Sequence, residues 1–183
     1  MRLPLTALLT CLLPLSAAAV VKDSRPEGFT LENSARVPAQ ADETWDALVN
    51  HVGKWWPADH TWWGESGNLT IEARAGGCFC ERAGGRQARH LEVVFVDPGK
   101  TLRLAGGLGP LQGMGLDGTL EFRLAPAEEG GTLVTLWYRA GGYTPDDLSA
   151  FAPVVDRVQA QQLDGLVRFL TERHAGAGAK QAD

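Results

Sequence analysis

The sequence predicts an α+β fold in which a curved antiparallel sheet of six to seven strands wraps around one long C-terminal helix. Two patterns carry this prediction. Short runs of alternating apolar and polar residues fill the middle of the chain, with Gly- or Pro-containing turns between them. A long stretch near the end then repeats apolar residues at helical spacing. A sheet curved over an amphipathic helix buries the apolar face of both.

The first elements are a strand and a short helix. The stretch 29–37 is expected to be a strand, although its alternation is mixed. A helix should begin at Ala41, because acids occupy its first turn and apolar residues then recur at helical spacing. Gly53 and Pro57 should end this helix. Its apolar residues are Trp45, Leu48, Val49 and Val52.

A run of six strands should follow, as an antiparallel meander. Residues 97–100 (DPGK) and 128–131 (EEGG) are the clearest turns between them. In the strand near residue 120, apolar and polar residues alternate, which is typical of a sheet with one wet face. Gly76 and Gly77 should provide a sharp bend before the second of these strands. The expected strands are 69–73, 78–82, 89–96, 101–104, 118–124 and 132–139.

The chain should close with a long helix over 147–173. Pro153 lies inside this segment, so the alternative to a start at Asp147 is a helix with Pro153 in its first turn and a short separate turn before it. Residues 174–183 are small and polar and should form a disordered tail. The apolar stripe consists of Leu148, Phe151, Ala152, Val155, Val158, Leu163, Leu166, Val167 and Leu170.

The N-terminus has the pattern of an export signal. Arg2 precedes an apolar run over 3–15, and small residues follow at a cleavage pattern, with cleavage expected after Ala19. The run is too short to span a bilayer. The sequence therefore predicts a signal peptide over 1–19, a lead-in over 20–27, one domain over 28–173, and a periplasmic or secreted location.

Charge excludes some partner classes. Removing 19 of the 183 residues leaves 164, and losing Arg2 changes the formal charge from −5 to −6. Nucleic acids and anionic membrane surfaces are bound through clustered positive charge, which this chain lacks. No nucleic-acid partner and no stable membrane insertion are expected, and the oligomeric state is left open.

Two cysteines remain after the signal peptide, Cys78 and Cys80. In an extended strand their Cα atoms would lie roughly 6.6 Å apart, near the upper limit of disulfide geometry, so a disulfide would need a distorted backbone. Thiolate and imidazole suit zinc or copper, so a metal site with His60 or His90 is an alternative, but the second cysteine pair typical of structural zinc sites is missing from the sequence. We expect small apolar packing residues, with no metal and no cofactor.

The most unusual segment is WWPADHTWW, which places Trp55, Trp56, Trp62 and Trp63 around His60. Tryptophan suits core, interface or ligand-wall positions. A Pro-interrupted segment with this much aromatic surface should either cap the core or line the mouth of a cavity. The Gly-rich stretch 106–115 lacks the strand-to-helix context of a nucleotide fingerprint and should be a loop over that cavity.

Several of these segments together resemble the SRPBCC (START-like, helix-grip) superfamily. They are VGKWWPADHTWWGESGNL, ARAGGCFCE, VDPGKTLRL and GGLGPLQGMGL, followed by the terminal helix. The chain is most similar to bacterial proteins of the activator-of-heat-shock-protein-90-ATPase-like and polyketide-cyclase-like groups. The resemblance covers about residues 28–173 and implies a helix-grip fold with a deep pocket for apolar small molecules or lipids. Cys78 and Cys80 depart from the usual pattern of polar and aromatic residues there.

The expected function is binding of an apolar or aromatic small molecule between the sheet and the C-terminal helix, and whether the protein also catalyses a reaction is left open. An alternative is a cyclase- or hydrolase-like enzyme in which His60 and Glu81 act as acid and base. Glu81 could instead pair with Arg103 or Arg139. A third possibility, action on a chaperone, fits an exported protein least. The expected ligand-binding residues are Trp55, Trp56, Trp62, Trp63, Phe79, Met114, Trp137, Tyr138 and Tyr143.

Overall fold

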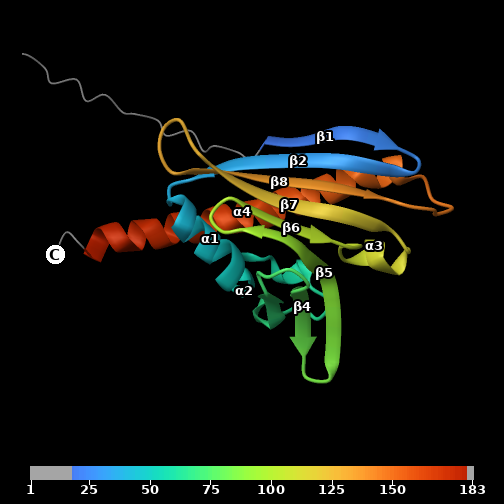
Figure 1. The fold of residues 1–183 in the computed structure, drawn as a ribbon, viewed down its shortest axis with the longest axis horizontal. Helices are drawn as coiled ribbons and strands as arrows, with labels where there is room; N and C mark the ends of the chain where they lie inside the picture. Colours follow the sequence, from blue (N-terminus) through green and yellow to red (C-terminus); the bar gives the residue numbers. More distant parts are fainter. Residues whose placement is uncertain (1–17, 181–183) are drawn as a thin grey trace, which may run out of the picture.

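The computed structural model describes residues 18–180, which form an eight-stranded antiparallel sheet and a long C-terminal helix (Figure 1). The strand order is β1-β2-β8-β7-β6-β5-β4-β3, so the predicted α+β class and the curved sheet are confirmed, with eight strands rather than six to seven. The strands are β1 (Ala18–Arg25), β2 (Gly28–Val37), β3 (Leu69–Ile71), β4 (Cys78–Ala83), β5 (Arg86–Asp97), β6 (Thr101–Ala105), β7 (Asp117–Pro126) and β8 (Thr132–Gly141). The helices are α1 (Ala41–Asn50), α2 (Val52–Trp55), α3 (Pro110–Gly113) and α4 (Leu148–Lys180), with 3-10 turns η1 (Ala58–His60) and η2 (Ser66–Asn68).

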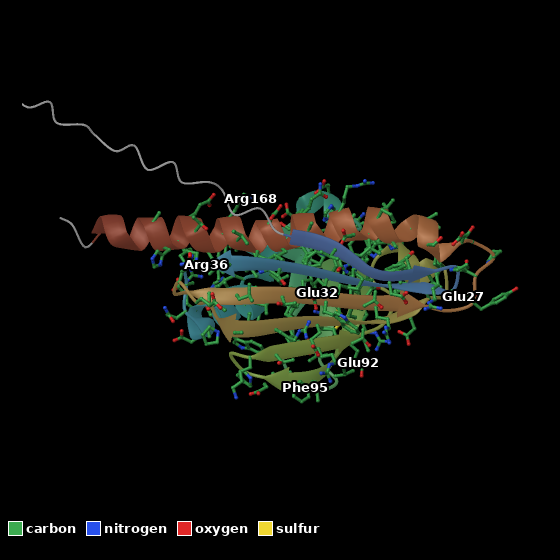
Figure 2. All side chains as sticks on the ribbon, turned by 90° about the horizontal axis from the view of Figure 1, so that it is seen from above. Glu27, Glu32, Arg36, Glu92, Phe95 and Arg168 are labelled. Carbon is green, nitrogen blue, oxygen red and sulfur yellow. A yellow bond between two sulfur atoms is a disulfide. The ribbon has the colours of Figure 1, made fainter. Side chains whose placement is uncertain are left out.

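One face of the sheet is buried and the other is polar. In β7, Leu120 and Phe122 are buried, whereas Glu121 points the other way and pairs with Arg103 and Arg123. This confirms the predicted wet face, because successive strand residues point to opposite sides. Figure 2 shows Glu32 of β2 among these outward-facing side chains, where it accepts a hydrogen bond from Arg123. The opposite, concave face carries the core.

Helix α4 packs on the sheet along β1 and β2, and its last turns project past the end of the strands (Figure 1). It begins at Leu148, next to the predicted start at Asp147, so the alternative start at Pro153 is wrong. Proline has no N–H to bond the carbonyl of Ser149 four residues earlier. The hydroxyl of Ser24 in β1 donates to that carbonyl at 3.4 Å instead, which compensates for the missing bond.

The structure differs from the expected ends of the domain. The lead-in over 20–27 is mostly strand: β1 pairs antiparallel with β2, because the edge of β2 offers backbone groups that need partners. Helix α4 continues to Lys180 rather than ending at Arg173. The predicted signal peptide lies outside the described residues except for Ala18 and Ala19. Within the described residues, no helix is long and apolar enough to cross a membrane.

Cys78 and Cys80 form a disulfide, contrary to the expectation of two free packing residues. Their Cα atoms are 5.3 Å apart, closer than in a regular strand. The pairing register of β4 with β5 shifts between Phe79 and Cys80, so the backbone is irregular at this point. That bulge supplies the distortion which a disulfide between such close cysteines requires. Before this strand, Gly76 has a φ of +75°, which confirms the predicted bend.

Candidate functional site

A cavity of about 440 Å³ lies between α4 and the concave face of the sheet. Four parts of the chain wall it: one face of α4, the segment around α3, the tryptophan segment, and single residues of β5 and β8. Most of the wall is apolar. From α4 and the α3 segment it includes Phe151, Val154, Val155, Val158, Leu108, Pro110, Leu111 and Met114. The volume lies within the range of small-molecule sites.

The tryptophan segment folds back on itself to form one wall. The 3-10 turn η1 follows α2, and across it the indole N–H of Trp56 donates to the carbonyl of His60 at 3.1 Å. The ring of Trp56 packs edge-on against Phe79, with their centroids 5.2 Å apart. Trp62 is 46% exposed and lines the cavity, so it lies at the mouth.

A buried carboxylate holds this wall in place. Glu81 in β4 is fully buried and accepts the backbone N–H groups of Trp62 at 2.9 Å and Trp63 at 3.1 Å. Its third contact is His90 Nε2, at 3.1 Å. The expected pairing with Arg103 or Arg139 is therefore wrong. Arg103 bonds Glu121, and Arg139 donates to Thr30, both on the outer face of the sheet.

His90 lines the cavity and is the residue that strand alternation misses. Regular alternation in β5 would turn His90 outward, because Leu91 and Val93 point inward. The bulge opposite Phe79 and Cys80 leaves His90 without a cross-strand partner and buries it beside Leu91. Burial lowers the pKa of His90 below its ordinary value, although the hydrogen bond and charge of Glu81 act in the opposite direction. The imidazole is therefore neutral at pH 7.

His60 also lines the cavity, but the structure does not bring it to the cavity together with Glu81. The Nδ1 atom of His60 is buried and has no hydrogen-bond partner within residues 18–180. Glu81 lies behind the wall, where its oxygens are bonded to backbone N–H groups and to His90. Glu81 thus positions the cavity wall formed by the tryptophan segment. The histidine that contacts Glu81 is His90, and the predicted pair of His60 and Glu81 is not formed.

Of the expected ligand-binding residues, Trp56, Trp62, Met114 and Tyr138 line the cavity. The hydroxyl of Tyr138 accepts a hydrogen bond from the backbone N–H of Leu108 at 3.4 Å. Burial raises the pKa of this tyrosine to about 12, so the phenol is protonated at pH 7.

The other expected residues lie elsewhere, for identifiable reasons. Trp55 and Phe79 are core residues, and Trp55 packs edge-on against Phe122. Trp137 precedes Tyr138 in β8 and so points to the outer face, where Arg139 covers its ring. The rings of the last two lie away from the cavity: Arg86 stacks over Trp63, and Tyr143 is 94% exposed in the loop before α4.

Two polar side chains of the wall were not expected. Gln159 and Gln162 of α4 line the cavity and are buried. Both amide atoms of Gln159, and the amide oxygen of Gln162, have no hydrogen-bond partner within the described chain. They lie between members of the apolar stripe, and helical spacing alone could have marked them as inward-facing. Over residues 18–180 no group of three or more His, Cys, Asp or Glu side chains is arranged to hold a metal ion.

Comparison with solved structures shows the same fold in several bacterial proteins. CalU16 from Micromonospora echinospora has a TM-score of 0.56 at 21% identity, covering 84% of this chain and 81% of its own. MLL2253 from Mesorhizobium loti has a TM-score of 0.57 at 20% identity, covering 79% and 97%. DynU16, a protein of the dynemicin biosynthetic locus, has a TM-score of 0.52 at 18% identity, covering 77% and 46%.

No curated protein matches the sequence significantly. The profile of one family, described as polyketide cyclase / dehydrase and lipid transport, matches residues 28–171. These residues include all eight strands except β1, the tryptophan segment, and the part of α4 that walls the cavity. The chain therefore belongs to the polyketide cyclase/dehydrase and lipid transport family of the SRPBCC superfamily.

Proposed function

We propose that this protein binds an apolar or aromatic small molecule in the cavity between the sheet and α4. The observation that carries the proposal is the cavity itself, about 440 Å³ and walled mostly by apolar side chains. Transfer of apolar surface from water into such a site contributes roughly 25 cal/mol per Å². The half-exposed indole of Trp62 at the mouth offers a flat contact to an entering ring.

The test compares two adjacent tryptophans. Trp62 and Trp63 both donate backbone N–H groups to Glu81, yet only Trp62 lines the cavity. We expect wild-type protein to bind the neutral fluorescent probe N-phenyl-1-naphthylamine. Trp62→Ala should weaken its binding about tenfold, through lost apolar contact worth about 1.4 kcal/mol. Trp63→Ala is the matched control and should leave the affinity unchanged.

Fluorescence titration of the probe gives both affinities, and urea unfolding shows that both variants remain folded. Equal affinities of the two variants and the wild type would remove Trp62 from the site. Absence of probe binding to the wild-type protein would contradict the proposed function.

We also propose that the protein acts after export, in the periplasm or outside the cell. The support is the charged, apolar and small-residue pattern of residues 1–19. N-terminal sequencing of the protein recovered from its own host should begin at Val20. Recovery of the intact N-terminus from the cytoplasmic fraction would contradict export.

A second candidate function is acid–base catalysis at His90. The observation in its favour is the buried contact of His90 Nε2 with Glu81, together with the position of the ring at the cavity wall. In the tautomer with the proton on Nε2, Glu81 accepts that proton's hydrogen bond and Nδ1 keeps the lone pair of a general base. The family includes cyclases and dehydrases, whose chemistry needs such a base.

Deuterium exchange at the methyl group of 2-acetonaphthone in D2O tests this candidate, because exchange requires proton abstraction next to a carbonyl. A general base should make exchange faster with wild-type protein than in buffer, and His90→Gln should abolish the difference. If the wild type exchanges the probe no faster than buffer, binding alone remains as the function.

A further inference from the structure

Gln159 introduces polarity into a helix face whose other cavity-lining residues, apart from Gln162, are apolar. Its side chain is fully buried, lines the cavity, and leaves both the amide nitrogen and the amide oxygen without a partner within residues 18–180. Gln162, nearly one turn further along α4, adds an unpartnered amide oxygen to the same wall. Buried amides without partners are costly, whereas a leucine at either position would extend the apolar stripe at no such cost.

The unpartnered atoms require both kinds of hydrogen-bonding group from a ligand. An amide nitrogen donates and an amide oxygen accepts, so the two ends of Gln159 together need one acceptor and one donor. This requirement holds whichever way round the amide lies. A purely apolar ligand would displace water from these groups and replace none of its hydrogen bonds, which reduces affinity.

The charges around the cavity favour a neutral ligand. None of the cavity-lining residues that the structure describes is a lysine or an arginine. Asp59 contributes an acid at the rim, and Asp156 is buried one turn before Gln159, where it accepts a hydrogen bond from Asn33 at 3.1 Å. An anionic headgroup such as the carboxylate of a fatty acid would lose its hydration here and meet no counter-charge.

We propose that the cavity selects a neutral molecule whose apolar body carries a donor–acceptor group, such as a carboxamide, a lactam or a hydroxy-ketone. Gln159 and Gln162 of α4 form hydrogen bonds with that group, while the apolar side chains of the wall contact the apolar body of the ligand. This inference rests on the proposed function and deepens it: it separates neutral oxygenated ligands from free fatty acids and from plain hydrocarbons.

The test uses three probes with one ring system and substituents of similar size: 2-naphthamide, 2-isopropylnaphthalene and 2-naphthoate. Calorimetry gives the Kd of each for the wild type, Gln159→Leu and Gln161→Leu. Gln161 is the neighbouring, exposed glutamine of α4, so the same change there is the matched control. Gln159→Leu should raise the Kd ratio of 2-naphthamide to 2-isopropylnaphthalene about tenfold.

In the wild type, 2-naphthoate should bind more weakly than 2-naphthamide, and Gln161→Leu should leave every ratio unchanged. Gln162→Leu provides a second variant and should shift the same ratio in the same direction. An unchanged ratio in both cavity variants, or naphthoate binding at least as tightly as naphthamide, would overturn this inference and leave the proposed function standing. If none of the three probes binds the wild type, both fall.

Discussion

Among single residues, His90 both lines the cavity and contacts the buried side chains of Phe79 and Glu81. Its ring lies 5.2 Å from that of Phe79, and its Nε2 atom is the only histidine nitrogen bonded to Glu81 among the described residues. Because burial disfavours the imidazolium, folding keeps His90 neutral at a pH where the unfolded chain would already protonate it.

This difference in pKa makes stability depend on pH. The unfolded histidine titrates near 6.5 and the folded one lower. The contribution of His90 is therefore fully present above about pH 6.5 and is lost as the pH falls from there through the folded-state pKa. The free energy of unfolding should decline by at most about 1.4 kcal/mol per pH unit from this group.

Urea unfolding of wild type and His90→Gln between about pH 7.5 and 5.5 measures the effect. The decline should be steeper in the wild type. His174→Gln, which changes an exposed histidine of α4, should follow the wild-type curve. If the free energy of unfolding of wild type and His90→Gln fell equally with pH, His90 would have the same pKa in the folded and the unfolded protein, which would contradict the prediction.

At the scale of elements, the position of α4 depends on one glycine. A side chain at Gly165 would collide with the backbone carbonyl of Trp55 at the end of α2. The glycine thus lets α4 approach α2 closely. The helix face with Val158 and Gln162 and the tryptophan segment thereby line the same cavity.

Gly165→Ala should therefore destabilise the protein, against the usual direction for a helix interior. Alanine normally gains up to about 1 kcal/mol over glycine in a helix. Overpacking against backbone costs about 1–3 kcal/mol and should outweigh that gain. Gly176→Ala in the same helix meets nothing within 4 Å and should be neutral or stabilising. Thermal unfolding of the two variants distinguishes the cases, and stabilisation by Gly165→Ala would show that α4 has room to shift.

The elements that the sequence predicts well are those with a strong repeat. The stripe of α4 and the alternation in β7 each determine which face is buried, and the structure agrees with both. The sequence could not show β1, because this exposed edge strand is stabilised by the backbone of β2 rather than by burial of its own side chains. Nor could it show the bulge that turns His90 inward, since a register shift depends on the neighbouring strand.

The site was predictable only in part, for a related reason. Aromatic residues mark a cavity wall but do not say which way they face. Adjacent Trp137 and Tyr138 cannot both point inward from one regular strand, and only the register of β8 selects Tyr138. The carboxylate of Glu81 could not be assigned to the tryptophan segment, because backbone N–H groups have no signature in a sequence.

At the scale of the whole molecule, ligand binding in the cavity should raise the free energy of unfolding of the protein. A molecule that binds only the folded state at a free concentration of 100 times its Kd should add about 2.7 kcal/mol to the free energy of unfolding. Val158→Trp places an indole into the cavity and should abolish this gain. With N-phenyl-1-naphthylamine as the ligand, the melting temperature should rise in wild type and stay constant in the variant.

Arg168→Trp adds the same ring on the exposed side of α4 and serves as the control (Figure 2). It should respond to the probe as the wild type does. A response retained in Val158→Trp would place the bound probe outside the cavity.

The hydrogen bonds from the tryptophan segment to Glu81 determine which substitutions this site can accept during evolution. Because the carboxylate bonds the backbone at positions 62 and 63, the path of the wall does not depend on which side chains those positions carry. Mutation at position 62 can reshape the entrance while the main-chain scaffold persists. Selection or laboratory evolution of new ligand preferences should therefore tolerate many residues at position 62, whereas Glu81 should resist replacement.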